Sequence, residues 1–195
     1  MINLILNGTR IAVMDFDEAA PLLEGDTLFA ELQNSARRRE KQLTLLLLRK
    51  LAGSEVVLRH DPDGAPLPIG EGQHVSISHS GHEVAVALSD SPYIGIDVES
   101  PREALRRVSS RFLSRREQEY YTDLNQLLRA WVIKEAVYKA MHRKNLTSSE
   151  IALSCQEPEN MIDHAEVGDV RFSISLHHLP TDSLLGVARA VNNNF

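Results

Sequence analysis

The fold is decided by residues 75–88, which read VSISHSGHEVAVAL. Apolar and small residues alternate from 75 to 78 and run almost unbroken from 84 to 88, with a turn-rich HSGH stretch between them. Such patterns are typical of strands, so this stretch predicts two neighbouring strands. A similar pair lies near the end of the chain, where FSIS at 172–175 resembles VSIS and GVARAV at 186–191 resembles VAVA.

Working outward, each strand pair has a long helix before it. Asn34 or Ser35 can begin a helix that runs to about Leu51, with Gly53 just past its end. A second amphipathic helix is expected from Leu124 to about Met141.

Further strands are expected at the beginning and in the middle of the chain. Residues 2–6 and 10–13 predict a strand pair that turns at Asn7-Gly8, a favoured hairpin dipeptide. Residues 93–99 predict another strand, and the basic segment after it predicts a helix.

The repeated order of elements predicts an α+β protein built from two similar halves. The stretches at 75–78 and 172–175 are 97 residues apart, about half of the 195-residue chain. We therefore expect an N-terminal half over residues 1–92 and a C-terminal half over 93–195, related by a pseudo-twofold axis. Each half would be a small, mainly antiparallel sheet packed on one long helix.

Composition excludes several classes of protein. A net charge of −6 argues against a general nucleic-acid binder, whose surface is basic. A single cysteine, Cys155, excludes an internal disulfide and a cysteine zinc cluster. No apolar run approaches the ~20 residues that cross a bilayer, and the N-terminus resembles a strand rather than a signal peptide. By elimination, we expect a cytoplasmic protein without a membrane partner.

Two carboxylates lie two residues apart in the predicted strand at 93–99. Strand periodicity puts Asp97 and Glu99 on one face, while Ile96 and Val98 point into the core. Carboxylates held so close repel each other unless a cation lies between them, and a hard ion such as Mg²⁺ suits oxygen ligands. From this spacing alone, however, a solvent-facing acidic strand edge is the favoured interpretation.

The second long helix places a third carboxylate and a lysine on one face. Trp131, Glu135 and Lys139 are spaced by four residues. The glutamate would complete a three-carboxylate metal site, and the lysine one turn further along would hold phosphate oxygens. An ordinary Glu-to-Lys helix pair explains the same spacing, so this motif alone does not decide.

Taken together and in order, these motifs resemble those of the 4′-phosphopantetheinyl transferases. The segments that carry the resemblance are GIDVE at 95–99, FLSRRE at 112–117, and WVIKEA at 131–136 followed by Lys139. Upstream, SISHSG at 76–81 resembles an element of the surfactin-synthetase-type, pseudo-dimeric branch. The order and spacing of four motifs make coincidence improbable.

The resemblance implies an activity and a set of site residues. The enzyme would transfer the phosphopantetheine arm of coenzyme A to a serine of an apo carrier protein and release 3′,5′-ADP. The implied ligands of Mg²⁺, or of Mn²⁺, are Asp97, Glu99 and Glu135. Glu117 would either deprotonate the acceptor serine or position a metal-bound water. Together with Glu135 and Lys139 it forms the implied catalytic set.

Coenzyme A would lie between the two halves. The resemblance places Lys134 and Lys139 beside its pyrophosphate, and Ser78 and His79 near its 3′-phosphate. Where the family usually reads Gly-Lys-Pro before this element, the present chain reads Gly-Ala-Pro at 64–66, so one cation is missing. Arginines at 37–39, Arg38 among them, would compensate.

A basic segment follows the predicted strand at 93–99 and predicts a docking surface. If one helix continues through this segment, Arg107, Arg111 and Arg115 lie four apart on one face. A solvated basic helix is the simpler interpretation of such a run. The resemblance instead implies that an acidic acyl or peptidyl carrier protein docks near Arg106, Arg107 and Arg111.

Two other functions fit some of the same residues. One is a catalytically silent relative that binds coenzyme A or carrier protein, and the other is an unrelated metal-dependent phosphodiesterase. Four acidic residues at the motif positions speak against the silent relative. Because two halves already supply one complete cleft, we expect a monomer.

Overall fold

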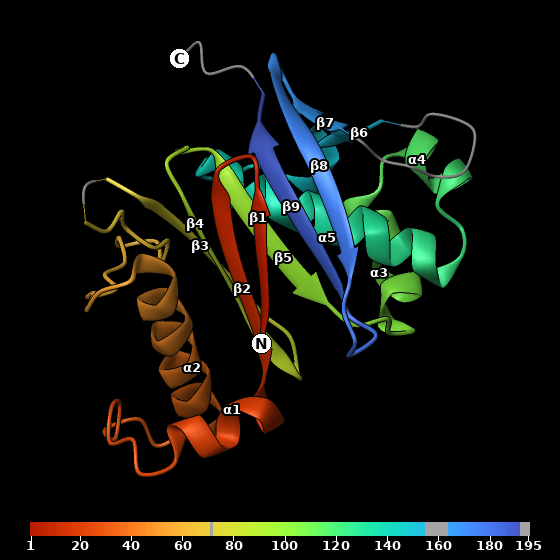
Figure 1. Ribbon diagram of the computed structural model, residues 1–195. Helices are drawn as coiled ribbons and strands as arrows, with labels where there is room; N and C mark the ends of the chain where they lie inside the picture. Colours follow the sequence, from red (N-terminus) through yellow and green to blue (C-terminus); the bar gives the residue numbers. More distant parts are fainter. Residues whose placement is uncertain (71, 155–163, 192–195) are drawn as a thin grey trace. The chain divides into compact units, whose positions relative to one another are not determined.

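The structure is a computed structural model that describes residues 1–70, 72–154 and 164–191, so Cys155 lies outside the described residues. The fold is α+β, as predicted, with two antiparallel sheets and five α-helices in the described part of the chain. The chain divides into two compact units, Met1–Pro92 and Tyr93–Phe195. Within each unit a long helix covers one face of a sheet, α2 in the first unit and α5 in the second (Figure 1).

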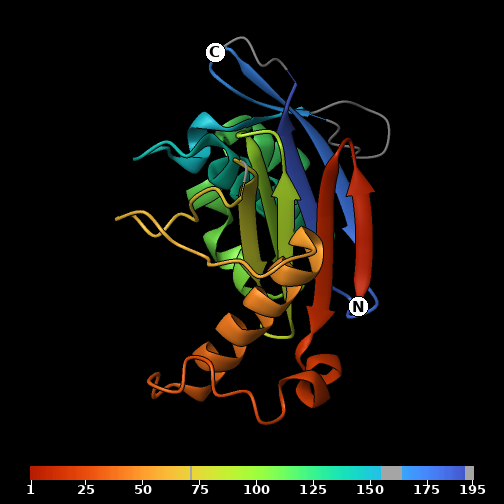
Figure 2. The ribbon, with the colours of Figure 1, turned by 60° about the vertical axis from the view of Figure 1, so that its left-hand side comes forward.

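Unit 1 contains a four-stranded sheet and two helices. Its elements are β1 (Ile2–Leu6), β2 (Thr9–Asp15), α1 (Phe16–Leu23), α2 (Ser35–Ala52), β3 (His74–His79) and β4 (Glu83–Ser89). The strand order is β1-β2-β4-β3. Helix α2, orange in Figure 2, packs on β4 and β2.

Local signals explain the boundaries of unit 1. Asn7 and Gly8 turn the first hairpin with positive φ angles of 48° and 81°. The Asn34 side chain accepts the amide of Arg37 at the start of α2, and Gly53 ends the helix in the left-handed conformation. The apolar face of α2 then packs on the sheet in a core of Leu43, Leu47, Leu48, Val75, Val84, Val86 and Leu88.

Unit 2 contains a five-stranded sheet and three α-helices. Its elements are β5 (Ile94–Glu99), α3 (Ala104–Phe112), α4 (Arg115–Tyr120), α5 (Leu124–Met141), the 3₁₀ helix η1 (Ser148–Glu150), β6 (Ala152–Leu153), β7 (His164–Val167), β8 (Val170–His178) and β9 (Leu184–Ala190). The strand order is β5-β9-β8-β7-β6. Asp123 begins α5 through a capping box with Gln126.

The two units share a chain order. In unit 1, β2 precedes α2 and pairs with β4, which pairs with β3. In unit 2, β5 precedes α5 and pairs with β9, which pairs with β8. Both long helices have 18 residues. The pseudo-twofold axis itself stays a prediction.

Two local features of the structure go beyond the predicted elements. The segment after β2 forms helix α1, where the sequence predicts no element. The basic helix is not continuous, because α3 ends at Phe112 and Ser114 begins α4 with its own capping box. Arg115 is therefore not aligned with Arg107 and Arg111.

None of the described helices combines the length and the apolar character of a membrane span.

Candidate active site

The candidate site lies where α5 crosses β5, and two glycines allow this close approach. A Cβ atom at Gly95 would lie 1.9 Å from the Ala136 carbonyl oxygen and 2.7 Å from the Ala140 nitrogen. Gly186 pairs with Asp97 on the neighbouring strand, and a Cβ there would lie 2.5 Å from Val132 Cγ1. The sheet surface beside Asp97 is therefore bare backbone, against which α5 packs directly.

Strand alternation puts Asp97 on the same face as Gly95, beneath α5. Asp97 is buried, and its Oδ1 accepts a hydrogen bond from Lys139 Nζ at 2.8 Å. The same ammonium donates to the Ile96 carbonyl at 3.0 Å. Lys139 stays partly exposed, with 29% of its side chain accessible. This contact joins the middle of β5 to the last turn of α5.

The other two acidic residues of the motif are near Asp97. Both carboxylate oxygens of Glu99 are engaged, one by the Ser100 amide at 3.1 Å and the other by Arg102 Nη2 at 2.8 Å. Burial raises the pKa of Glu135, the negative charges of Asp97 and Glu99 raise it further, and Lys139 opposes the change. The three carboxylates are thus electrostatically coupled.

The donor set fits a hard divalent cation, although the side chains do not converge on one point. Coupled carboxylates are the ligands that Mg²⁺ prefers. Within the described residues, however, no three acidic, histidine or cysteine side chains form a ready metal cluster. Asp97 and Glu99 turn instead toward Lys139 and Arg102. Holding an ion would require these two carboxylates to turn away from their internal cations.

The coupled charges predict that Glu135→Gln stabilises the metal-free protein. The pKa of Glu135 lies above its ordinary 4.5 in the folded chain, so the folded state holds this proton to higher pH than the unfolded state. Ionisation therefore lowers stability as pH rises from 4.5 through the folded pKa. Glu135→Gln removes this penalty, and at neutral pH we expect a melting temperature about 2 °C higher in EDTA.

A melt by circular dichroism at several pH values checks this expectation. The difference between the variant and the wild type should vanish at a pH below 4.5, where both side chains are neutral. An unchanged difference across that range would contradict the charge coupling.

Lys134 and Glu117 form a buried ion pair away from solvent. Lys134 is 1% exposed, and its Nζ donates to Glu117 Oε2 at 2.8 Å, Ser148 O at 2.9 Å and Ile151 O at 2.8 Å. An ammonium has three N–H donors, and these three bonds use all of them. The expectation that Lys134 contacts pyrophosphate therefore does not agree with its position. Lys134 instead ties α5 to α4 and to the segment before β6.

Glu117 completes this junction with its remaining lone pairs. It accepts the Ser114 amide at 2.8 Å through Oε2, as the second half of the capping box of α4. Its Oε1 accepts the Leu153 amide at 3.0 Å. Glu117 and Ser114 also line a hollow of about 400 Å³ in unit 2, together with Arg116, Ser149, Ala152, Leu153, Ser154, His164 and Glu166.

A larger hollow of about 580 Å³ lies in unit 1, beside α2. Its basic lining comes from Arg37, Lys41 and Arg49 of α2, with His79 of β3 facing Glu40 at 3.2 Å. The spacing of four between Arg37 and Lys41 is a helical signal that the sequence analysis did not use. Its apolar lining includes Leu45, Val56, Leu58 and Ile77.

Two predicted ligand residues do not line this hollow. The Arg38 guanidinium donates through Nε and Nη2 to the Leu32 carbonyl, at 3.2 and 2.5 Å. Because β3 continues through His79, strand alternation points Ser78 to the opposite face, where it is buried. His79 lines the hollow without Ser78, and Gly64 and Pro66 line it on either side of Ala65.

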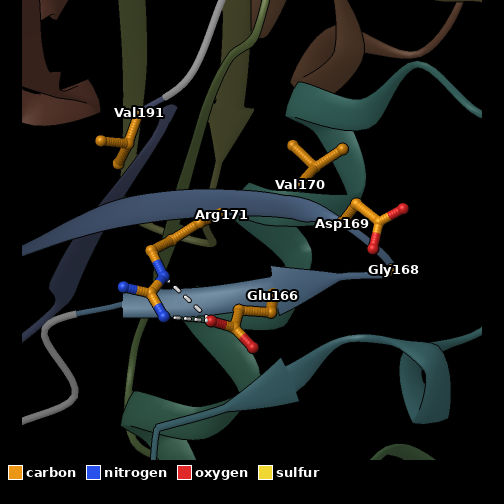
Figure 3. A pocket seen from close by; sticks show the side chains of 6 residues that line it. All are labelled: Glu166, Gly168, Asp169, Val170, Arg171 and Val191. Carbon is orange, nitrogen blue, oxygen red and sulfur yellow. Dashed lines mark hydrogen bonds and ion pairs between the residues drawn. The ribbon is translucent and has the colours of Figure 1, made fainter. Parts of the chain in front are cut away.

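A third hollow, of about 390 Å³, lies at the turn between β7 and β8 (Figure 3). Arg171 crosses it to bind Glu166, with its Nη2 2.7 Å from Oε1. Gly168, Asp169, Val170 and Val191 complete the lining. No residue of the predicted site lines it, so it is not the candidate site.

Helix α3 presents arginines on its exposed side. Its apolar residues Leu105, Val108 and Phe112 pack into the core of unit 2, and Phe112 meets the Trp131 ring edge-on at 5.1 Å. Arg106 donates to the Thr122 carbonyl and pairs with Glu103. Arg107 and Arg111 are exposed and form no ion pair with any residue that the structure describes.

Comparison with known protein families finds a match that covers most of unit 2. Residues 93–186 match the model of the 4′-phosphopantetheinyl transferase superfamily (ACPS). The match begins just before β5 and ends in β9, so it covers both glycines and the whole of α5. A search of curated proteins finds no match.

Proposed function

We propose that this protein transfers phosphopantetheine from coenzyme A to a serine of an apo carrier protein. The premise is that residues 93–186 are a 4′-phosphopantetheinyl transferase superfamily domain. The serine hydroxyl attacks the β-phosphorus and loses its proton to solvent water. The bond from that phosphorus to the oxygen that bridges the two phosphates breaks, and 3′,5′-ADP leaves with that oxygen. The observation that supports this most is the packing of α5 on β5, which gathers Asp97, Glu135 and Lys139.

The charges at this crossing suit phosphoryl transfer. A Mg²⁺ ion held by Asp97, Glu99 and Glu135 would neutralise diphosphate charge, and Mn²⁺ would serve equally. Lys139 is partly exposed and offers an ammonium to the phosphate oxygens. Little covalent work falls to the protein, so alignment and charge stabilisation carry the catalysis.

Glu117 is best assigned a positioning role rather than that of general base. Three N–H donors, from Lys134, Ser114 and Leu153, already occupy its two oxygens. Among the described residues, one lone pair of the carboxylate remains free, but the side chain is only 5% exposed, so a serine hydroxyl has little access to it. We therefore assign Glu117 and Lys134 together to holding α4 and β6 against α5.

The hollow of unit 1 suits the nucleotide end of coenzyme A. Arg37, Lys41 and Arg49 supply cations for the 3′-phosphate, and the apolar wall of Leu45 and Ile77 suits an adenine ring. His79 contributes a further donor at this wall. The basic residues of α2 would thus stand in for the lysine that the chain lacks at Ala65.

The activity is tested by measuring 3′,5′-ADP release from coenzyme A with and without an apo carrier protein. We expect release only with the apo carrier, and none with a carrier whose acceptor serine is alanine. Asp97→Asn is the matched inactive variant. Release without any carrier would indicate a phosphodiesterase, and binding of coenzyme A without release would indicate a silent relative.

The exposed arginines of α3 predict how the carrier is recruited. Reversing Arg107 and Arg111 to glutamate should raise the KM for an acidic carrier about tenfold or more, because opposite charges steer the encounter. The kcat and the KM for coenzyme A should stay within a few-fold. Steady-state kinetics at two ionic strengths measures the effect, since salt screens exposed charges.

Arg171→Glu is the matched control, since Arg171 is also exposed but lies on β8 and already pairs with Glu166. It should leave the KM for the carrier unchanged. A double variant of Arg107 and Arg111 that keeps the salt dependence of the wild type would contradict docking on α3.

A further inference from the structure

We infer that Lys139 is an exchangeable counter-ion, which holds Asp97 while the site lacks a divalent ion and is released toward phosphate when Asp97 becomes a ligand. This inference rests on the proposed function and adds a coupling between binding of the divalent ion and binding of the diphosphate. Its starting point is that the Lys139 ammonium lies 2.8 Å from Oδ1 of Asp97, a residue that the proposed function assigns to the metal.

The position of Lys139 makes exchange possible. Among the described residues, its ammonium is anchored by only two acceptors, Asp97 Oδ1 and the Ile96 carbonyl. Lys139 is on the last turn of α5 and is partly exposed, so its tip can leave without breaking a buried core. Lys134 on the same helix is the opposite case, since its three bonds are buried.

The charge count at the crossing favours the same exchange. Three carboxylates at 97, 99 and 135 face two internal cations, Lys139 on Asp97 and Arg102 on Glu99. Glu135 forms no ion pair with any residue that the structure describes. A divalent ion would give these carboxylates the missing charge and leave Lys139 as surplus positive charge beside the ion. A bound diphosphate is the group that this surplus would attract.

The affinity for the divalent ion and the affinity for the diphosphate should therefore be coupled. Lys139 opposes binding of the ion alone, because it competes for Asp97. It favours binding of the ion when a diphosphate is present, because it then has a new partner. By linkage, the diphosphate must tighten the ion and the ion must tighten the diphosphate by the same factor.

The test measures Mn²⁺ binding directly by electron paramagnetic resonance, on the full chain, with and without inorganic pyrophosphate. Lys139→Met should bind Mn²⁺ roughly fivefold more tightly than the wild type in the absence of pyrophosphate, as expected for loss of one competing ion pair. The tightening of Mn²⁺ by pyrophosphate should be largest in the wild type and nearly absent in Lys139→Met. Lys139→Gln should behave in the same way and guards against a packing effect of methionine.

The matched control is Lys144→Met, which removes the same charge from an exposed position of unit 2. It should leave both Mn²⁺ affinities near those of the wild type. Equal or weaker Mn²⁺ binding by Lys139→Met, an equal change in Lys144→Met, or no Mn²⁺ binding by the wild type would each overturn the exchange. If the wild type transfers phosphopantetheine but pyrophosphate tightens Mn²⁺ equally in the wild type and in Lys139→Met, this inference alone is refuted. If the tightening is lost in Lys139→Met as expected but the wild type transfers nothing, the proposed function alone is refuted.

Discussion

Lys134→Met is expected to lower the free energy of unfolding by about 3–5 kcal/mol, because it leaves the Glu117 carboxylate buried without its counter-ion. Both side chains are almost fully buried, at 1% and 5% exposure. The lost bonds to Ser148 and Ile151 also free two carbonyl groups at the junction of α5 with η1. Urea denaturation followed by circular dichroism measures the change.

A double variant separates the ion pair from the rest of the packing. Adding Glu117→Gln to Lys134→Met removes the stranded charge, so the double variant should be more stable than Lys134→Met alone. If Lys134 instead served the phosphates of coenzyme A, Lys134→Met would keep its stability and lose affinity for coenzyme A. That result would contradict the buried position of Lys134.

Gly95→Ala should be the most damaging of the small substitutions in unit 2. The new Cβ would meet the Ala136 carbonyl oxygen at 1.9 Å, and since this atom belongs to the helix backbone, α5 must move as a whole. Overpacking of this kind costs about 3 kcal/mol or more. The displaced helix would carry Glu135 and Lys139 away from Asp97, so transfer should fall at least ~100-fold even at temperatures where the variant is folded.

Gly81→Ala is the matched control for stability. Gly81 has no positive φ, and a Cβ there would meet no atom within 4 Å. Its free energy of unfolding should stay within about 0.5 kcal/mol of the wild type. Urea denaturation of both variants tests the contrast, and equal losses of stability would show that the gap between α5 and β5 is not set by Gly95.

Much of the fold could be predicted from the sequence because the signals for it are local. Asn34 and Gly53 bound α2 through short-range capping, and Asn7-Gly8 marks the first hairpin. The break between α3 and α4 was also readable, since Ser114 and Glu117 have the spacing of a capping box. Alignment of Arg107, Arg111 and Arg115 on one face requires a single helix, and this break rules that condition out.

Other features depend on contacts that no local pattern contains. Helix α1 has Pro21 in its second turn, which argues against a helix from sequence alone. The spacing of Glu135 and Lys139 predicts a shared helical face, but only the packing on Gly95 shows which strand that face meets. Lys134 is buried whereas Lys139 is partly exposed, and the positions of the two lysines in the motif do not indicate this difference.

The capping box of α4 has a consequence for anyone who scans the motif by mutation. Glu117 is at once the partner of Lys134, the cap of a six-residue helix and the acceptor of the Leu153 amide. Loss of function at this position would look like loss of a proton acceptor, although a frayed helix would have the same phenotype. Ser114→Ala offers an independent comparison, because it weakens the same cap without touching any ionisable group.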